Sequence, residues 1–168
     1  MGRIILVTGG ARSGKSSHAE ARVRAMPGAP VYIATSEPQD DEMRDRVARH
    51  REARGPGWTL IEEPLDLVGA LDRSDGTGPR LVDCLTLWLA NHMFAERDWE
   101  PEAARLTEAL LRQKSPVVLV SNEVGMGIVP ENALARAFRD AQGWVNQRVA
   151  KVADEVEFVV SGLPLRVK

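Results

Sequence analysis

The residues Gly9-Gly10-Ala11-Arg12-Ser13-Gly14-Lys15-Ser16 follow the pattern G-x-x-x-x-G-K-[ST], which is a complete phosphate-binding loop. The loop comes directly after the apolar run Ile4-Ile5-Leu6-Val7, and residues 17–23 can continue it as a helix. A continuous apolar run is typical of a buried parallel strand, so the loop stands at a strand-to-helix turn. This context predicts an α/β fold with a site for the phosphates of a nucleoside triphosphate.

The residue types within the loop suit that chemistry. Glycines allow backbone N–H groups to converge on phosphate oxygens, and the helix that begins near Lys15 adds the positive end of its dipole. We expect the Lys15 ammonium to reach the β- and γ-phosphates and the Ser16 hydroxyl to complete a Mg²⁺ shell. A chance glycine-rich turn does not account for the spacing, the lysine, the hydroxyl and both flanking elements together.

Length and composition are those of an ordinary soluble globular protein. The 168 residues are enough for one domain, which we place at 1–168. A net charge of −2 gives no general attraction for nucleic acid or an anionic membrane. The single cysteine excludes an internal disulfide, residues 1–8 do not form a signal peptide, and no apolar run approaches about 18 residues. We therefore expect a cytoplasmic protein with no nucleic-acid partner and no membrane span.

Short apolar runs alternate with amphipathic stretches along the rest of the chain. The expected strands are 31–35, 58–63, 81–85, 116–121 and 156–164. The expected helices are 38–54, 64–71, 85–94, 101–113 and 132–153. This alternation predicts an α/β fold with a mainly parallel sheet of about six strands, flanked by helices.

Residues at the ends of two expected strands are candidates for the nucleotide site. Ligands gather at the carboxyl ends of strands in open α/β sheets, which brings Ala34, Thr35 and Ser36 beside the phosphate loop. An ordinary strand-end turn explains these three residues equally well. Asp83 follows the apolar pair Leu81-Val82 and is a candidate to hold Mg²⁺. Its alternative role is to cap the next helix, and one residue can fill both roles.

His50 lies in a charged stretch whose chemistry suits a nucleophile. It shares one side of the expected helix 38–54 with two apolar residues, and arginines flank it. Repulsion from Arg49, Arg51 and Arg54 disfavours the imidazolium, so the ring stays neutral near pH 7, and the same cations can hold phosphate oxygens. On spacing alone, a structural histidine remains the alternative.

The ordered set of motifs resembles the bifunctional adenosylcobinamide kinase/adenosylcobinamide-phosphate guanylyltransferases of cobalamin biosynthesis. The resemblance rests on ILVTGGARSGKS at 5–16, YIATS at 32–36, DDEMRDRVARHREAR at 40–54, VSNEVGMGIVPEN at 120–132, FRDAQGWVNQ at 138–147 and ADEVEFVVSGLPL at 153–165. A phosphate loop alone is shared by many unrelated proteins, but this ordered set is specific and covers nearly the whole chain.

The resemblance implies a RecA-like P-loop domain that assembles as a homotrimer and has two activities. The first transfers phosphate from ATP or GTP to the aminopropanol hydroxyl of adenosylcobinamide. The second moves GMP from GTP onto adenosylcobinamide phosphate through a guanylylated histidine, which gives adenosylcobinamide-GDP and pyrophosphate. By position His50 matches the nucleophile. The other matching nucleotide contacts outside the loop are Ala34, Thr35, Ser36, Arg51, Glu52, Ala53, Arg54, Glu62 and Asp83.

Two other functions compete with this reading. A simple phosphate-loop kinase of a small metabolite, with a structural His50, would form no covalent nucleotide. A RecA-like nucleic-acid or regulatory protein would bind DNA or RNA in a salt-dependent way, and the net charge of −2 argues against it. In the bifunctional enzyme, kinase activity should survive the loss of His50.

Overall fold

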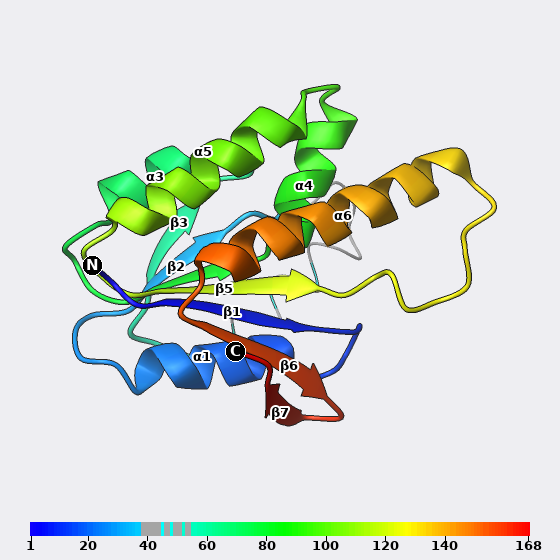
Figure 1. Ribbon diagram of the computed structural model, residues 1–168. Coiled ribbons are helices and arrows are strands. Elements are labelled where there is room, and N and C mark those ends of the chain that lie inside the picture. Colours follow the sequence, from blue (N-terminus) through cyan, green and yellow to red (C-terminus); the bar gives the residue numbers. More distant parts are fainter. Residues whose placement is uncertain (38–44, 46–47, 49–51, 53–54) are drawn as a thin grey trace.

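The computed structural model describes residues 1–37, 45, 48, 52 and 55–168, and these build one seven-stranded sheet with helices on both faces (Figure 1). The strands are β1 (Ile4–Gly9), β2 (Val31–Ala34), β3 (Thr59–Glu62), β4 (Arg80–Asp83), β5 (Val117–Asn122), β6 (Glu155–Val160) and β7 (Leu163–Arg166). The helices are α1 (Lys15–Arg24), α3 (Leu67–Arg73), α4 (Leu85–Phe94), α5 (Trp99–Arg112) and α6 (Ala133–Val152). None of these helices is long and apolar enough to cross a membrane.

The strand order is β3-β2-β4-β5-β1-β6-β7, and every pair except β6 with β7 is parallel. Strand β5 therefore lies between β1, which leads into the phosphate loop, and β4, which ends in Asp83. The mainly parallel α/β fold predicted from the sequence is confirmed. The parallel pairing brings the carboxyl ends of the strands to one edge, where the site residues collect.

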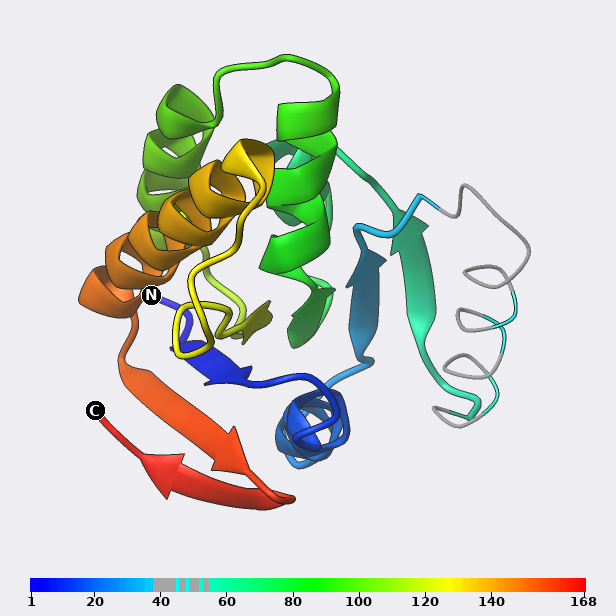
Figure 2. The same ribbon diagram turned by 90° about the vertical axis from the view of Figure 1, so that its right-hand side faces the viewer.

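Helices cover both faces of the sheet. Because side chains alternate along a strand, each buried strand contributes apolar residues to both faces. On β1, Ile4 and Leu6 pack in a cluster with α3, α4, α5 and α6, whereas Ile5 and Val7 pack in a second cluster with α1. Figure 2 shows α1 alone beneath the middle of the sheet and the other described helices together above it. A strand buried on both faces reads as a continuous apolar run, which is why β1 and β5 could be recognised from the sequence.

The prediction of a single final strand over residues 156–164 is wrong. The chain turns at Ser161 and Gly162, which have φ angles of 52° and 80°, and returns as β7. Positive φ at both central residues is typical of the tight turns that join hairpin strands. Leu163 pairs with Val160 in antiparallel register, so β7 is an edge strand of the sheet. The apolar pattern of the sequence did not distinguish β7 from β6.

Candidate nucleotide-binding site

The phosphate loop leaves the sheet at the end of β1 and enters α1. Gly14 is the N-cap residue of this helix, with a φ of 93°, and a Cβ there would lie 3.1 Å from the Cα of Gly162. Only glycine adopts this conformation without strain. No side chain among the described residues caps the helix. The backbone N–H groups of its first turn therefore suit an anion.

Two side chains of the loop, Ser13 and Lys15, are buried. Lys15 is buried, and its Nζ donates to the carbonyl of Gly10 at 3.0 Å. The Ser13 hydroxyl is buried without a hydrogen-bond partner in the described part of the chain. A buried hydroxyl without a partner is costly, and a phosphate oxygen would accept its hydrogen bond. The loop therefore fits the phosphates that its sequence predicts.

The ends of β4, β2 and β3 place three predicted residues in one row. Ala34 pairs in register with Asp83 on one side and Glu62 on the other. Asp83 lies on the same face of the sheet as α1, because Leu81, two residues earlier, packs in the cluster against that helix. Glu62 is exposed on the edge strand, four strands from Gly9, or about 19 Å at the usual strand spacing. One ligand can contact both Glu62 and the phosphate loop only if it extends along the carboxyl ends of these strands.

The Thr35 hydroxyl lies behind this row and is used within the protein. Thr35 is fully buried, and its Oγ1 donates to the Cys84 carbonyl at 2.7 Å and accepts from the Cys84 N–H at 2.8 Å. The Thr35 N–H donates to the carbonyl of Asp83 at 3.1 Å. The peptide bond between Asp83 and Cys84 is cis. Thr35 thus fixes the backbone on both sides of that bond.

The alternative role of Asp83 as a helix cap is wrong. The N-cap residue of α4 is Cys84, and no side chain caps this helix in the described structure. The Asp83 carboxylate instead accepts a hydrogen bond from the hydroxyl of Tyr32, with 2.8 Å between Oδ2 and the phenol oxygen. Burial, and then the neighbouring Asp83, raise the pKa of the Cys84 thiol to about 11, so the thiol is neutral beside the carboxylate.

A polar cluster at the end of β5 was not foreseen from the sequence. Ser121 on β5 and the α6 residues Gln142 and Asn146 hydrogen-bond one another at 2.5–3.1 Å. Asn146 also donates to the Asn122 carbonyl at 3.0 Å, and the Asn122 N–H donates to Thr86 Oγ1 at 2.8 Å. These bonds hold the end of β5 next to Gly9, its partner in the parallel register. The only sequence signal was the i, i+4 spacing of two amides on one helix face.

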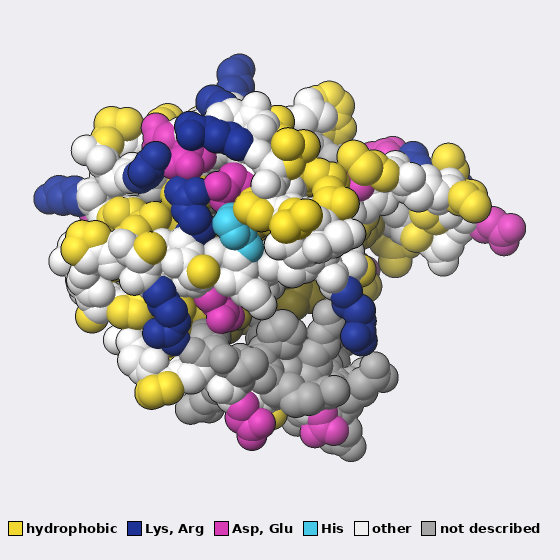
Figure 3. Space-filling model, turned by 90° about the horizontal axis from the view of Figure 1, so that it is seen from below, with side chains coloured by type: hydrophobic (Ala, Val, Ile, Leu, Met, Phe, Trp, Pro, Cys, Tyr) yellow, Lys and Arg dark blue, Asp and Glu magenta, His cyan; other side chains and the backbone are white. Residues whose placement is uncertain are grey.

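Hydrogen bonds and ion pairs to two buried glutamates anchor α1 to β6 on the outer side of the loop strand. His18 Nε2 lies 2.8 Å from Glu157 Oε2, and Arg22 pairs with both Glu157 and Glu155. Arg3 also pairs with Glu155. Acidic and basic side chains and a histidine gather on this face in Figure 3. These contacts fix the helix whose N-terminus completes the loop.

Several predicted contacts cannot be placed in this geometry. His50, Arg51, Ala53 and Arg54 lie outside the described residues, and Glu52 is described as exposed. Their roles stay predictions.

The described residues fit Mg²⁺ only together with phosphate oxygens. In the part of the chain that the structure describes, no group of three or more His, Cys, Asp and Glu side chains could hold a metal ion by itself. Mg²⁺ usually takes one or two carboxylates and completes its shell with phosphates and waters. Ser16 at the start of α1 and Asp83 on the same face of the sheet match that preference.

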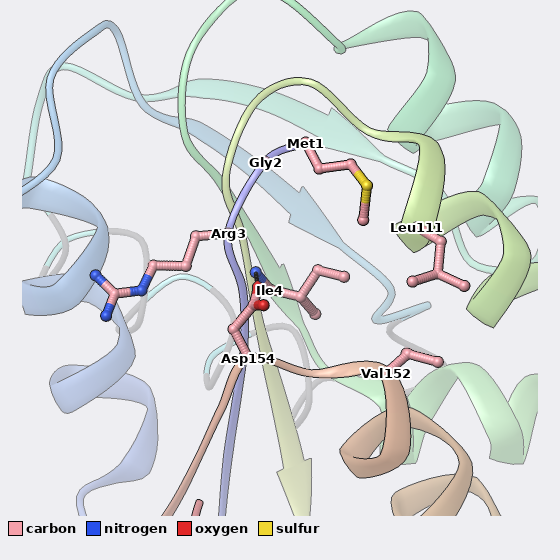
Figure 4. Close-up of a pocket in the computed structure, with 7 residues that line it drawn as sticks. All are labelled: Met1, Gly2, Arg3, Ile4, Leu111, Val152 and Asp154. Atoms are coloured by element: carbon pink, nitrogen blue, oxygen red, sulfur yellow. Dashed lines mark hydrogen bonds between the residues drawn. The ribbon is translucent and has the colours of Figure 1, made fainter.

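A pocket of about 400 Å³ lies at the opposite edge of the sheet (Figure 4). It is lined by Met1, Gly2, Arg3, Ile4, Leu111, Val152 and Asp154. The Asp154 carboxylate already accepts a hydrogen bond from the Ile4 N–H at 2.7 Å. The pocket is at the amino end of β1 and is therefore separate from the phosphate loop.

A phosphate loop at the carboxyl edge, with one strand between it and an acidic strand end, defines a RecA-like P-loop NTPase fold. Solved structures agree. The chain aligns over 99% of its length with the flagellar accessory protein FlaH of Methanocaldococcus jannaschii, at 11% identity and a TM-score of 0.52, covering 78% of that chain. An ATPase of the type III secretion system of pathogenic bacteria gives a TM-score of 0.61 at 10% identity, with 99% of this chain and 57% of that one covered. At these identities the likeness shows the fold alone.

The family follows from the sequence comparison. The chain belongs to the cobinamide kinase/cobinamide phosphate guanyltransferase family, which it matches over residues 5–167. It is 45% identical to the bifunctional adenosylcobalamin biosynthesis protein CobU of Salmonella typhimurium, with 98% of this chain and 99% of that protein covered. It is also 45% identical to CobP of Pseudomonas aeruginosa, with coverages of 97% and 96%. CobU of Escherichia coli is 43% identical, with coverages of 98% and 99%.

Proposed function

We propose that this protein phosphorylates adenosylcobinamide with ATP or GTP and then transfers GMP from GTP to the adenosylcobinamide phosphate. The observation that carries this proposal is a complete phosphate loop at the start of α1 in a chain that matches the bifunctional family over residues 5–167. The two activities use the same kinds of substrate, because each needs a nucleoside triphosphate held by its phosphates.

In the kinase reaction the chain mainly binds and orients. Loop N–H groups and the N-terminus of α1 hold the β- and γ-phosphates, and Lys15 neutralises charge that develops as the phosphoryl group moves. The acceptor hydroxyl oxygen forms a bond to the γ-phosphorus and releases its proton to solvent, and the nucleoside diphosphate leaves with the electron pair of the broken bond. Ser16 and Asp83 would hold Mg²⁺, which would supply neutralisation of the negative charge on the phosphates. Positioning supplies much of the rate enhancement.

The guanylyl transfer is assigned to His50 on the strength of its position in the sequence. A neutral imidazole nitrogen attacks the α-phosphorus of GTP, the bond to the β-phosphate breaks, and pyrophosphate leaves. A phosphate oxygen of adenosylcobinamide phosphate then attacks the same phosphorus. The phosphorus–nitrogen bond breaks, which releases adenosylcobinamide-GDP and restores His50. One difficult displacement becomes two easier ones.

Assembly as a homotrimer in the cytoplasm is part of the same proposal. Support comes from apolar side chains that are exposed after β5 and at the start of α6, with exposed fractions of 79% for Met126, 96% for Ile128 and 55% for Leu134. In Figure 1 this segment extends away from the body of the molecule. Further copies of the chain would cover these side chains. Light scattering after gel filtration tests the trimer, and a monomeric mass would refute it.

The decisive experiment uses GTP labelled at the α-phosphate. Wild-type protein incubated with Mg²⁺ and this GTP should carry an acid-labile, alkali-stable label, because a phosphorus–nitrogen bond has that stability. His50→Ala should carry none yet still phosphorylate adenosylcobinamide with ATP. His92→Gln, a change at a histidine of α4, should keep the label. Unlabelled wild-type protein with full kinase activity would leave a simple kinase.

A further inference from the structure

Tyr32 makes a direct contact with the proposed magnesium carboxylate. It lies on β2 beside β4, paired in register with Leu81, and its hydroxyl donates to Asp83 Oδ2 at 2.8 Å. Tyr32 is 6% exposed and Asp83 is half-buried, so this bond is partly shielded from water. A hydrogen bond to an ionised acceptor is stronger than a neutral one. Among the residues that the structure describes, Tyr32 is the hydrogen-bond donor to this carboxylate, and it approaches Oδ2 rather than Oδ1.

Tyr32 is itself held in place from the other side. The Trp58 ring meets the Tyr32 ring edge-on, with 5.8 Å between centroids and 87° between planes. The Arg24 guanidinium lies 5.2 Å from the centroid of Trp58 and donates to the Pro56 carbonyl at 3.5 Å. Residues from α1, β2 and the approach to β3 thus support the phenol whose oxygen holds the Asp83 carboxylate.

The Tyr32 hydroxyl is not needed for packing, because a phenylalanine ring would fill the same space. Burying a hydroxyl costs free energy unless it is hydrogen-bonded, so a purely apolar ring would be the simpler core residue. Tyr32 is also the only tyrosine in the chain. Thr35 fixes the backbone of Asp83, and Tyr32 fixes its side chain, so both restraints on this carboxylate come from β2 and the residue after it.

We propose that Tyr32 is a positioning residue of the nucleotide site, because its hydroxyl holds Asp83 in the orientation in which Oδ1 contacts the bound Mg²⁺–nucleotide. The proposal rests on the role of Asp83 proposed above. A carboxylate that binds a metal is usually oriented by a hydrogen bond to its other oxygen, and loss of such a partner weakens metal binding by about 10- to 100-fold.

The test compares GTP affinities measured by titration calorimetry with Mg²⁺ and with EDTA. Tyr32→Phe keeps the ring against Trp58 and removes only the hydroxyl. We expect it to lose about tenfold or more of the affinity gained with Mg²⁺ and to match wild type in EDTA. Asp83→Asn should lose at least as much, and the double variant should equal Asp83→Asn, because the hydroxyl acts through the carboxylate.

The matched control is Ser74→Ala, which removes another buried hydroxyl, bonded to the Ala70 carbonyl at 2.8 Å in α3. It should lower the melting temperature without changing either affinity. Wild-type affinities in Tyr32→Phe, alongside a loss in Asp83→Asn, overturn the proposal, as do fully additive losses in the double variant. Wild-type protein that binds no GTP in either buffer refutes the proposed function instead.

Discussion

Replacing Thr35 by valine tests how the structure holds the end of β4. Valine has nearly the shape of threonine, so the change removes the hydroxyl and leaves little or no cavity. The Cys84 N–H and carbonyl then lose the partner that lies 2.8 and 2.7 Å away. Thr35 is fully buried and Cys84 is 7% exposed, so water cannot readily replace the lost hydroxyl.

The expected magnitude follows from one orphaned N–H and one carbonyl that loses one of two hydrogen bonds, because the Cys84 carbonyl still accepts from the Trp88 N–H at 3.2 Å. A buried backbone group left without a partner costs about 1–3 kcal/mol and a single lost hydrogen bond about 0.5–1.5 kcal/mol, so the change costs about 1.5–4.5 kcal/mol. At about 2–4 °C per kcal/mol for a protein of this size, a mid-range loss of about 3 kcal/mol lowers the melting temperature by about 6–12 °C.

Urea unfolding at constant slope measures the loss, with Thr35→Ser as the matched control. Serine keeps the hydroxyl and loses one buried methyl group, which costs about 0.8 kcal/mol as a transfer free energy. Thr35→Val should therefore be clearly less stable than Thr35→Ser. Equal stabilities of the two variants, or a Thr35→Val protein within about 1 kcal/mol of wild type, would show that the hydroxyl does not hold Cys84.

Three further predictions concern single residues. Burial raises the pKa of the Cys84 thiol to about 11, so fewer than about one thiol in a hundred is ionised at pH 8. A thiol reagent should therefore react with the unfolded chain and hardly with the native protein. Rapid labelling of the native protein would contradict this. Burial lowers the pKa of His92 below its ordinary 6.5, so the unfolded chain binds the proton more readily than the folded chain. The contribution of His92 to the free energy of unfolding is therefore complete above about pH 6.5 and declines as the pH falls. Unfolding free energies measured from pH 7.5 to 5 should show a smaller acid loss in His92→Gln, and an unchanged slope would refute the assignment. Gly14→Ala places a side chain at a φ of 93° and a Cβ 3.1 Å from the Cα of Gly162. It should lower the free energy of unfolding by about 1–2 kcal/mol and weaken GTP binding. Wild-type affinity for GTP would exclude a strained loop.

Much of the fold could be predicted because its signals are local. The apolar run of β1 and the glycines that follow it are adjacent in the chain. The residues that indicate where each helix begins and ends also lie within a few positions of those points. The boundary between β6 and β7 was missed because Ser161 and Gly162 interrupt the apolar pattern only briefly. The same locality explains why Lys15 could be predicted to contact the phosphates and Ser16 to contact Mg²⁺ from the sequence alone.

The neighbours of Asp83 could not be predicted in this way. Its position at a strand end was visible in the sequence, but its hydrogen bond to Tyr32, which is 51 residues away in the chain, was not. The nucleotide contact of Thr35 stays a prediction, and the hydrogen bond of its hydroxyl to Cys84, 49 residues away, could not be foreseen.

By itself the sequence determined a phosphate loop between a strand and a helix, an α/β alternation and the motif order of the family. Only the tertiary structure decided that β2 lies beside β4, that β5 separates Asp83 from the loop, and that Tyr32 and Thr35 restrain Asp83. The physical reason is that backbone periodicity and glycine spacing act over a few residues. Hydrogen bonds between strand ends depend on strand order and register, which are set by how the apolar faces of all the elements pack together.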